Sequence, residues 1–431
     1  MDLILRNASL PDGRTGVDIA VRAGRIAEVA PRIAAGGAEE IDAAGRLVTP
    51  PFVDSHFHLD ATLSLGLPRL NRSGTLLEGI ALWSELKPLL TPEAVAERAL
   101  AYCDWAVARG ILAIRAHVDV CDDRLVGVEA LLGVRRAVAP YLDLQLVAFP
   151  QDGLYRSPNA RENLLRALAL GVEVVGGIPH FERTREEGAR SVRELCGIAA
   201  ERGLRIDMHC DENDDPLSRH IETLALETRR LGLGGRVTGS HLTSMHSMDN
   251  AYAAKLIPLI RDCGVSVIAN PLINITIQGR NDTYPRRRGM TRVPELLEAG
   301  VPVAFGQDCT LDPWYSLGSG DMLEVAHMGI HVAQMTSPEA VHQAFVAVTE
   351  TPARIMGLEG YGLSPGCNAD LVLLDATTPA EAIRLRAPRL AVVRRGKVVS
   401  RAAPSRCELS LPGRPASVDF RLPARSAPPR S

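Results

Sequence analysis

Short apolar runs alternate with longer amphipathic stretches through the middle of the chain. In the longer stretches, such as 92–108 and 249–262, apolar residues recur every three or four positions, which predicts helices. A β-rich run followed by an amphipathic helix is one β/α unit, and eight such units predict a (β/α)8 barrel of the TIM type, an α/β fold. The eight runs that predict strands are 47–59, 112–118, 142–149, 172–178, 204–209, 236–241, 265–270 and 301–308.

Both chain ends carry shorter strand-like segments separated by Gly and Asp turns. Neither end is long enough to form a stable sheet domain alone. We therefore expect a small β-sandwich assembled from residues 1–50 and 366–407, and a catalytic barrel from residues 51–365. Residues 408–431 are rich in Pro, Arg, Ser and Ala, which predicts a loosely attached C-terminal tail.

Composition narrows the class of protein. The 431 residues are 46% hydrophobic and 23% charged, with a net charge of −3 and well-mixed signs, so we expect a soluble protein without a nucleic-acid or membrane-binding surface. No apolar run reaches the roughly 18–20 residues that span a bilayer, and the start lacks the pattern of a signal peptide. The eight cysteines include no Cys-x-x-Cys pair, which favours a reducing cytoplasm over a disulfide framework.

Metal-ligating residue types stand at the ends of four predicted strands. In a barrel of this kind, catalytic groups cluster at the C-terminal ends of the strands. The first strand ends with His56 and His58, whose one-residue spacing places both imidazoles on one face. The fifth strand ends at His209, the sixth at His241 and the eighth at Asp308. The sequence therefore predicts a metal centre at one rim of the barrel.

For the other histidines, the sequence gives weaker evidence of a role in the metal centre. His117 ends the second predicted strand, where we favour a structural role over one behind the metal ligands. His180 follows the fourth strand, where packing of the loop and a role in the site are equally compatible with the sequence. His327 and His331 are four positions apart in a predicted helix and are interpreted as ordinary helical residues. The arginine run at 286–288 is interpreted as a solvated loop.

The chain resembles the cytosine deaminase family of the amidohydrolase superfamily over most of its length. The His-x-His pair alone marks only the superfamily, whereas the Phe-Pro-Gln of 149–151 and the Asp-Pro-Trp-Tyr of 312–315 are specific to this branch. The segments that carry the resemblance are 50–53, 56–60, 73–76, 147–151, 178–181, 209–212, 269–272, 282–285 and 312–315.

The resemblance implies one divalent metal per subunit, held by His56, His58, His209 and Asp308. Three imidazoles and one carboxylate suit Zn²⁺ or Fe²⁺ and leave a position for water. Such a metal lowers the pKa of its water from about 16 to about 7, which gives a hydroxide nucleophile at neutral pH. The implied reaction is the hydrolytic deamination of a small free nucleobase with release of ammonia.

The resemblance also implies the groups that move protons. Glu212, three residues after His209, would protonate a ring nitrogen as C4 becomes tetrahedral and then help ammonia to leave. His241 and Asp308 would take or steer the proton of the attacking water.

The same resemblance implies the contacts that hold the base. Gln151 and the backbone carbonyl of Leu76 would bind the amide edge of the pyrimidine, because a glutamine offers both a donor and an acceptor. Trp314 would form a wall of the pocket.

The chain departs from the family pattern at the end of the eighth predicted strand. Where the family reads Gly-His-Asp-Asp, residues 306–309 read Gly-Gln-Asp-Cys, which leaves the role of Gln307 and the identity of the base open. Cys309 stands in place of the second aspartate and behaves as a small hydrophobe. It would open an apolar niche at C5 of the ring, so we expect 5-methylcytosine, cytosine or both as substrates. In the alternative, Cys309 is neutral and cytosine is preferred.

Three other functions are weighed against this one. Deaminases of isocytosine, isoguanine or creatinine would share the fold and the metal. A cyclic-amide hydrolase of the dihydroorotase type is disfavoured, because it needs a carboxylated lysine and residues 172–180 contain none. A non-catalytic scaffold is disfavoured because the whole ligand set is present. Since the family is oligomeric, we also expect a homo-oligomer.

Overall fold

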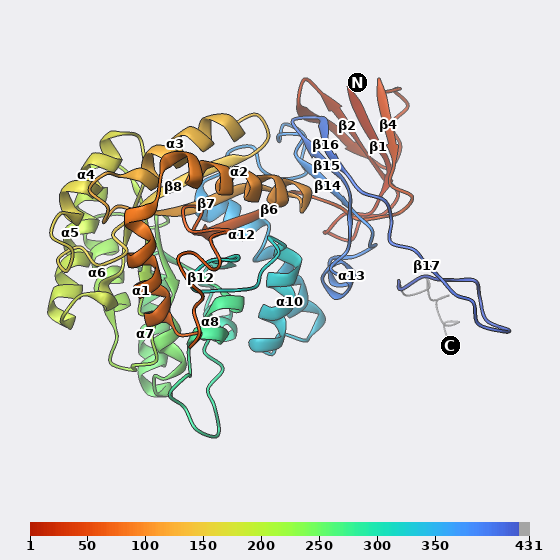
Figure 1. The fold of residues 1–431 in the computed structure, drawn as a ribbon. Coiled ribbons are helices and arrows are strands. Elements are labelled where there is room, and N and C mark those ends of the chain that lie inside the picture. The colour runs from red at the N-terminus through yellow and green to blue at the C-terminus, as the bar shows by residue number, and fades with distance from the viewer. Residues whose placement is uncertain (422–431) are drawn as a thin grey trace. The chain divides into compact units, whose positions relative to one another are not determined.

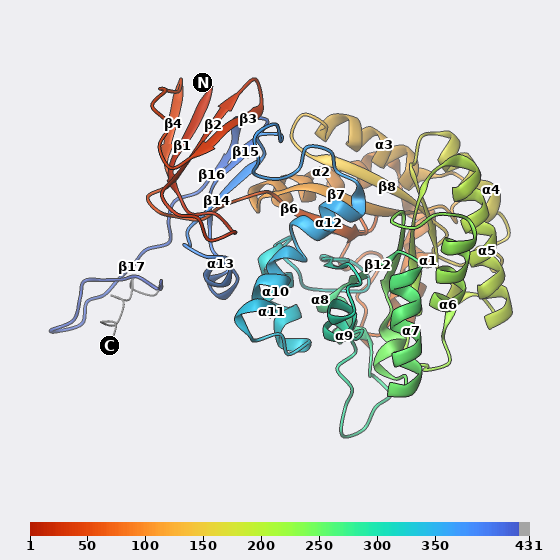
Figure 2. The same cartoon turned by 180° about the vertical axis from the view of Figure 1, so that it is seen from behind.

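The computed structural model describes residues 1–421, which form two compact units (Figures 1 and 2). One unit contains Met1–Pro50 together with the described residues from Gly360 on, and the other is Pro51–Glu359. The last ten residues of the expected tail, 422–431, lie outside the described residues. Within the described part of the chain, no helix has the length and apolar character needed to cross a membrane.

The smaller unit contains two four-stranded sheets, each described here in spatial order. The first sheet consists of β3 (Arg25–Ala30), β2 (Val17–Arg22), β1 (Leu3–Ala8) and β4 (Glu39–Asp42). The second consists of β16 (Lys397–Arg401), β15 (Arg389–Arg394), β14 (Leu371–Leu374) and β5 (Val48–Thr49). A short antiparallel pair, β17 (Cys407–Glu408) with β18 (Ser417–Val418), follows.

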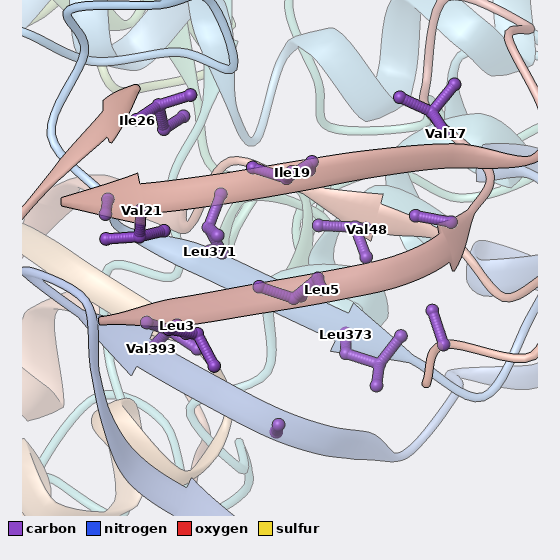
Figure 3. Packing of buried hydrophobic residues seen from close by; sticks show 14 of the residues in the cluster. Leu3, Leu5, Val17, Ile19, Val21, Ile26, Val48, Leu371, Leu373 and Val393 are labelled. Atoms are coloured by element: carbon purple, nitrogen blue, oxygen red, sulfur yellow. The ribbon is translucent and has the colours of Figure 1, made fainter. Parts of the chain in front are cut away.

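Apolar side chains of the two sheets form a single buried core (Figure 3). Leu5 and Ile19 of the first sheet cluster with Leu371 and Val393 of the second, and each is at most 1% exposed. The two ends of the chain thus cover one another's apolar faces, and the second sheet takes strands from both ends.

The larger unit is a parallel eight-stranded sheet whose spatial order follows the sequence. Its strands are β6 (Phe52–Phe57), β7 (Ile111–Asp119), β8 (Asp143–Phe149), β9 (Val174–Gly177), β10 (Arg205–Cys210), β11 (Val237–His241), β12 (Val265–Ala269) and β13 (Val303–Phe305). The (β/α)8 prediction is confirmed. The run 47–59, however, divides into β5 of one unit and β6 of the other at Pro50-Pro51, because proline cannot donate to a strand ladder.

Helices follow the strands around the barrel (Figure 1). The predicted stretches 92–108 and 249–262 form α2 (Pro92–Ala108) and α7 (Asn250–Asp262), which are capped by the side chains of Thr91 and Asp249. The others are α1 (Leu76–Leu86), η1 (Lys87–Leu89), α3 (Val126–Val138), α4 (Ala160–Ala169), η2 (Pro179–Phe181), α5 (Arg185–Arg202), α6 (His220–Arg230), η3 (Thr243–His246), α8 (Pro271–Ile277), α9 (Val293–Glu298), α10 (Met322–Val332), α11 (Pro338–Val346) and α12 (Glu350–Met356), with α13 (Pro379–Leu385) in the smaller unit.

Main-chain pairing between β6 and the segment after β13 closes the barrel. Phe57 forms a parallel bridge with Asp308. The amide of Asp308 donates to the carbonyl of His56 at 2.8 Å, and the amide of His58 donates to the carbonyl of Asp308 at 3.0 Å. The two ends of the sheet are therefore joined at the residues that the sequence assigns to the metal.

We predict that Gly329→Ala destabilises the barrel. Gly329 lies in α10, where an added Cβ would stand 2.5 Å from the ring of Phe305 in β13, so the core must shift at a cost of about 1–3 kcal/mol. The matched control is Gly197→Ala in α5, where a Cβ meets no atom within 4 Å. That change should raise stability by about 0.5–1 kcal/mol. Urea unfolding midpoints that move in the same direction for both variants would contradict the prediction.

Candidate active site

Four side chains point their donor atoms at one position on the barrel rim. The Nε2 atom of His209 lies 3.3 Å from Nε2 of His56 and 3.0 Å from Nε2 of His58. The Oδ1 atom of Asp308 lies 3.4 Å and 3.3 Å from the same two nitrogens. All four residues are buried. The rim therefore brings together the three imidazoles and the carboxylate that the sequence assigns to a metal.

This donor set fits a single divalent cation. Bonds of about 2.0–2.2 Å to an ion such as Zn²⁺ place neighbouring ligand atoms about 3.0–3.5 Å apart, close to the separations found here. At most one nitrogen of each close pair can carry a proton, so lone pairs converge on the centre. Asp308 Oδ1 has no hydrogen-bond partner among the described residues, although it is buried. His241 also has a ring nitrogen within 4.8 Å of donor atoms of His56, His209 and Asp308.

Backbone conformation at two strand ends helps to aim these side chains. Asp308 has a φ of 68° and His241 a φ of 72°, both in the left-handed region that non-glycine residues rarely adopt. Such a residue costs of order 1–3 kcal/mol and persists where the surrounding structure holds it. At Asp308 the barrel-closing hydrogen bonds supply that restraint.

Glu212 lies beside His241, with Oε1 3.2 Å from the imidazole Nδ1. Burial, reinforced by the negative charge of Asp308, raises the pKa of Glu212 well above its ordinary value, so this carboxyl is poised to hold a proton. Burial lowers the pKa of His241, which keeps its imidazole neutral. The side-chain amide of Asn274 lies 2.9 Å from the same Nδ1 and restrains the ring.

Asp308 is the most acidic member of the cluster. Burial opposes its ionisation, but the nearby imidazoles of His241, His56 and His58 outweigh burial and lower its pKa. Burial and the charge of Asp308 therefore favour the protonated form of Glu212, whereas the neighbouring imidazoles favour the ionised form of Asp308. This difference in pKa suits a site in which Asp308 is the anionic ligand and Glu212 is the proton donor.

A cavity of about 450 Å³, including its mouth, opens in front of these groups. The four residues expected to contact a substrate, Leu76, Gln151, Cys309 and Trp314, all line it, together with Glu212, His241 and three of the four candidate ligands. His56 is not on its wall. Burial and the charge of Asp308 raise the pKa of the Cys309 thiol well above its ordinary value, so this side chain is neutral.

Trp314 is held in place from two sides. The carboxylate of Asp312 accepts hydrogen bonds from the amides of Trp314 and Tyr315, both at 2.9 Å. On the other side α1 approaches so closely that a Cβ on Gly79 would stand 2.3 Å from the indole. Glycine at position 79 therefore lets the helix that begins at Leu76 pack against the Trp314 wall.

Several residues of the cavity wall were missed by sequence reasoning. They are Ile80, Ile178, His180, Phe181, Ile273 and Ile277. The rule that functional residues lie at strand ends points to 178–181, which follows β9, but the sequence alone did not decide between packing and a role in the site for His180. His327 and His331 do not line the cavity, and their rings contact each other in α10 in a tilted arrangement, with centroids 4.4 Å apart.

Comparison with known proteins agrees with this geometry. A family model described as the amidohydrolase family matches residues 39–400. The chain belongs to the amidohydrolase family. Its curated relatives include N-isopropylammelide isopropyl amidohydrolase of Pseudomonas sp. (strain ADP), 29% identical over 92% of this chain and 97% of the relative. They also include pterin deaminase of Rhizobium rhizogenes, 30% identical over 94% and 95%.

Among solved structures, this amidohydrolase is similar to the 5-methylcytosine deaminase of Klebsiella pneumoniae liganded with 5-fluorocytosine. The two chains are 43% identical, with a TM-score of 0.92 over 94% of this chain and 99% of that one. This similarity supports the cytosine deaminase branch of the family that the sequence motifs indicate.

We predict that the purified protein holds one divalent metal per chain and that His209→Ala loses it, because His209 Nε2 lies between the other two imidazoles. Elemental analysis of dialysed protein checks both statements. His327→Ala, which changes a histidine away from the cavity, is the control and should retain the metal. Two tightly bound metals per native chain, or full occupancy in His209→Ala, would overturn the assignment.

Proposed function

We propose that this protein deaminates free 5-methylcytosine to thymine and ammonia, with cytosine to uracil as the slower reaction. The observation that carries the proposal is a cavity lined by three of the four candidate ligands, by Glu212, whose pKa is raised, and by a neutral cysteine beside Asp308. The similarity to the Klebsiella pneumoniae enzyme supports the same substrate class.

In this proposal His56, His58, His209 and Asp308 hold a Zn²⁺ or Fe²⁺ ion. When bound, such an ion supplies a water acidic enough to lose its proton near neutral pH. Asp308 Oδ2 lies 4.0 Å from Nε2 of His241, and both residues line the cavity. With an ion bound, these two groups would take or steer the proton that the attacking water gives up.

Glu212 handles the proton on the substrate side. Its raised pKa keeps a proton on the carboxyl, which it donates to the ring nitrogen beside C4 as that carbon becomes tetrahedral. The resulting carboxylate then takes the proton of the new C4 hydroxyl and passes it to the amine, which leaves as ammonia while C4 becomes a carbonyl. The proton held by Asp308 and His241 returns to Glu212 and restores the acid. Gln151 and the carbonyl of Leu76 hold the opposite, amide edge of the ring, so that C4 faces the water.

Cys309 determines the preference between the two bases. An aspartate at this position would place a charged, hydrated group beside the C5 edge, whereas the thiol is neutral and apolar. Burying one methyl group there contributes roughly 0.8 kcal/mol, or about fourfold in kcat/KM. The absence of a buried charge next to that methyl group adds to the preference.

The acid role predicts the behaviour of Glu212→Gln. The amide keeps the size of the side chain but cannot supply the proton, so turnover should fall by about 10²–10⁴-fold while metal content is unchanged. Steady-state ammonia release and elemental analysis of the same preparation measure the two effects. A variant that keeps more than about a tenth of native kcat would remove Glu212 from this role.

The specificity role predicts a reversal in Cys309→Asp. The native protein should turn over 5-methylcytosine with the higher kcat/KM, and the variant should favour cytosine. Cys309→Ala is the matched control, because it removes the thiol without adding charge and should keep the preference for the methylated base. If the native protein cannot use 5-methylcytosine, or if Cys309→Asp leaves the ratio unchanged, Cys309 does not set specificity.

Deamination of another small cyclic amidine is the second candidate, favoured by the identity to the Rhizobium rhizogenes pterin deaminase. An ammonia-release screen over cytosine, 5-methylcytosine, isocytosine, isoguanine, creatinine and pterin separates these substrates. We further propose that the protein acts as a homo-oligomer in the cytoplasm. All eight cysteines are free, which is consistent with a reducing compartment.

A further inference from the structure

His117 of β7 contacts the imidazole of His56 on the side away from the cavity. Its Nε2 atom lies 3.1 Å from Nδ1 of His56, and the two ring centroids are 4.2 Å apart. Both side chains are completely buried. Nε2 of His56, the atom that faces His209 and Asp308, is on the other side of the ring. His117 therefore contacts the nitrogen of His56 that is on the opposite side of the ring from His209 and Asp308.

The chemistry of imidazole fixes what this contact must do. If the lone pair of His56 Nε2 binds a cation, the ring proton must reside on Nδ1. A buried N–H group needs an acceptor, because leaving it unpaired costs about 1–3 kcal/mol. Nε2 of His117 is within hydrogen-bond distance of Nδ1, whereas Asp207 Oδ1 is 3.9 Å away, too far for a hydrogen bond.

Asp207 is already committed to other partners. Its Oδ2 accepts from Arg115 at 3.0 Å, and its Oδ1 accepts from the hydroxyl of Ser240 at 2.6 Å. Metal-binding histidines usually donate to a carboxylate, a backbone carbonyl or water. Here a carboxylate lies nearby but is engaged, and a second imidazole occupies the acceptor position.

We propose that His117 is a positioning residue for the metal centre: its Nε2 lone pair accepts the Nδ1–H of His56 and so holds His56 in the tautomer that can bind the metal. This rests on the ligand role of His56 in the proposed function. In the opposite tautomer of the pair, His117 donates to His56, and Nε2 of His56 carries a proton directed at Asp308. That arrangement excludes the metal. The metal-binding arrangement places the ring proton of His117 on Nδ1, which is buried and has no hydrogen-bond partner among the described residues, so metal binding must outweigh that cost and the pair sets metal affinity.

Three substitutions at position 117 test the proposal. In His117→Gln the amide oxygen can reach the place of Nε2 and accept the same hydrogen bond. In His117→Asn the side chain is too short to do so, and in His117→Leu there is no acceptor. The measurement is the Zn²⁺ dissociation constant of each apoprotein, obtained by competition with a chromophoric chelator in the absence of substrate. Urea unfolding of the apoproteins monitors folding.

We expect His117→Leu and His117→Asn to bind Zn²⁺ about 10–100-fold more weakly than the native protein, and His117→Gln to remain within a few fold of it. Zn²⁺ binding within twofold of native in His117→Leu would overturn the proposal, as would equal losses in all three variants. If His117→Leu fails to fold, the difference in Zn²⁺ affinity between His117→Gln and His117→Asn tests the proposal. Because no substrate is present, failure of the deaminase assignment does not affect this readout.

Discussion

The closure of the barrel is the constraint on which the rest of the structure depends. The hydrogen bonds that join the first strand to the last are made by the backbone of His56, His58 and Asp308. Their side chains are also the ones that converge on the rim. The metal centre therefore forms only when the sheet closes, and the left-handed backbone at Asp308 is held by the same bonds. The conformational free energy spent on the left-handed backbone at Asp308 is therefore part of the free energy of closing the barrel at this position.

Local rules were sufficient to predict the barrel and the rim residues from the sequence. Alternation in a strand places His56 and His58 on one face, and the strand-end rule groups them with His209, His241 and Asp308. The walls contributed by α1 and α8 were not predictable in this way. Their positions depend on the path of long connections and on individual close contacts, such as that of Gly79 with Trp314, which no pattern of apolar residues encodes.

His117 shows a different limit of sequence reasoning. A single histidine at a strand end is more often a packed polar residue than a part of a site, and the sequence offered no reason to prefer the rarer role. Its proximity to His56 follows from the parallel register of β6 and β7, in which Phe57 pairs with Ala116. Register between strands separated by a long connection is a property of the assembled sheet. The same holds for the separation of acidity between Glu212 and Asp308, which arises from burial and neighbouring charges.

The left-handed turn at Asp308 has a consequence for how this enzyme family can change. In a regular strand, neighbouring side chains point to opposite faces, so a residue beside a ligand would be directed away from the cavity. Here the backbone departs from that alternation, and both Asp308 and Cys309 line the cavity. The proposed metal ligand and the proposed substrate contact are therefore consecutive in sequence but can be replaced separately. A substitution at position 309 changes the wall of the cavity and leaves the carboxylate at position 308 in place.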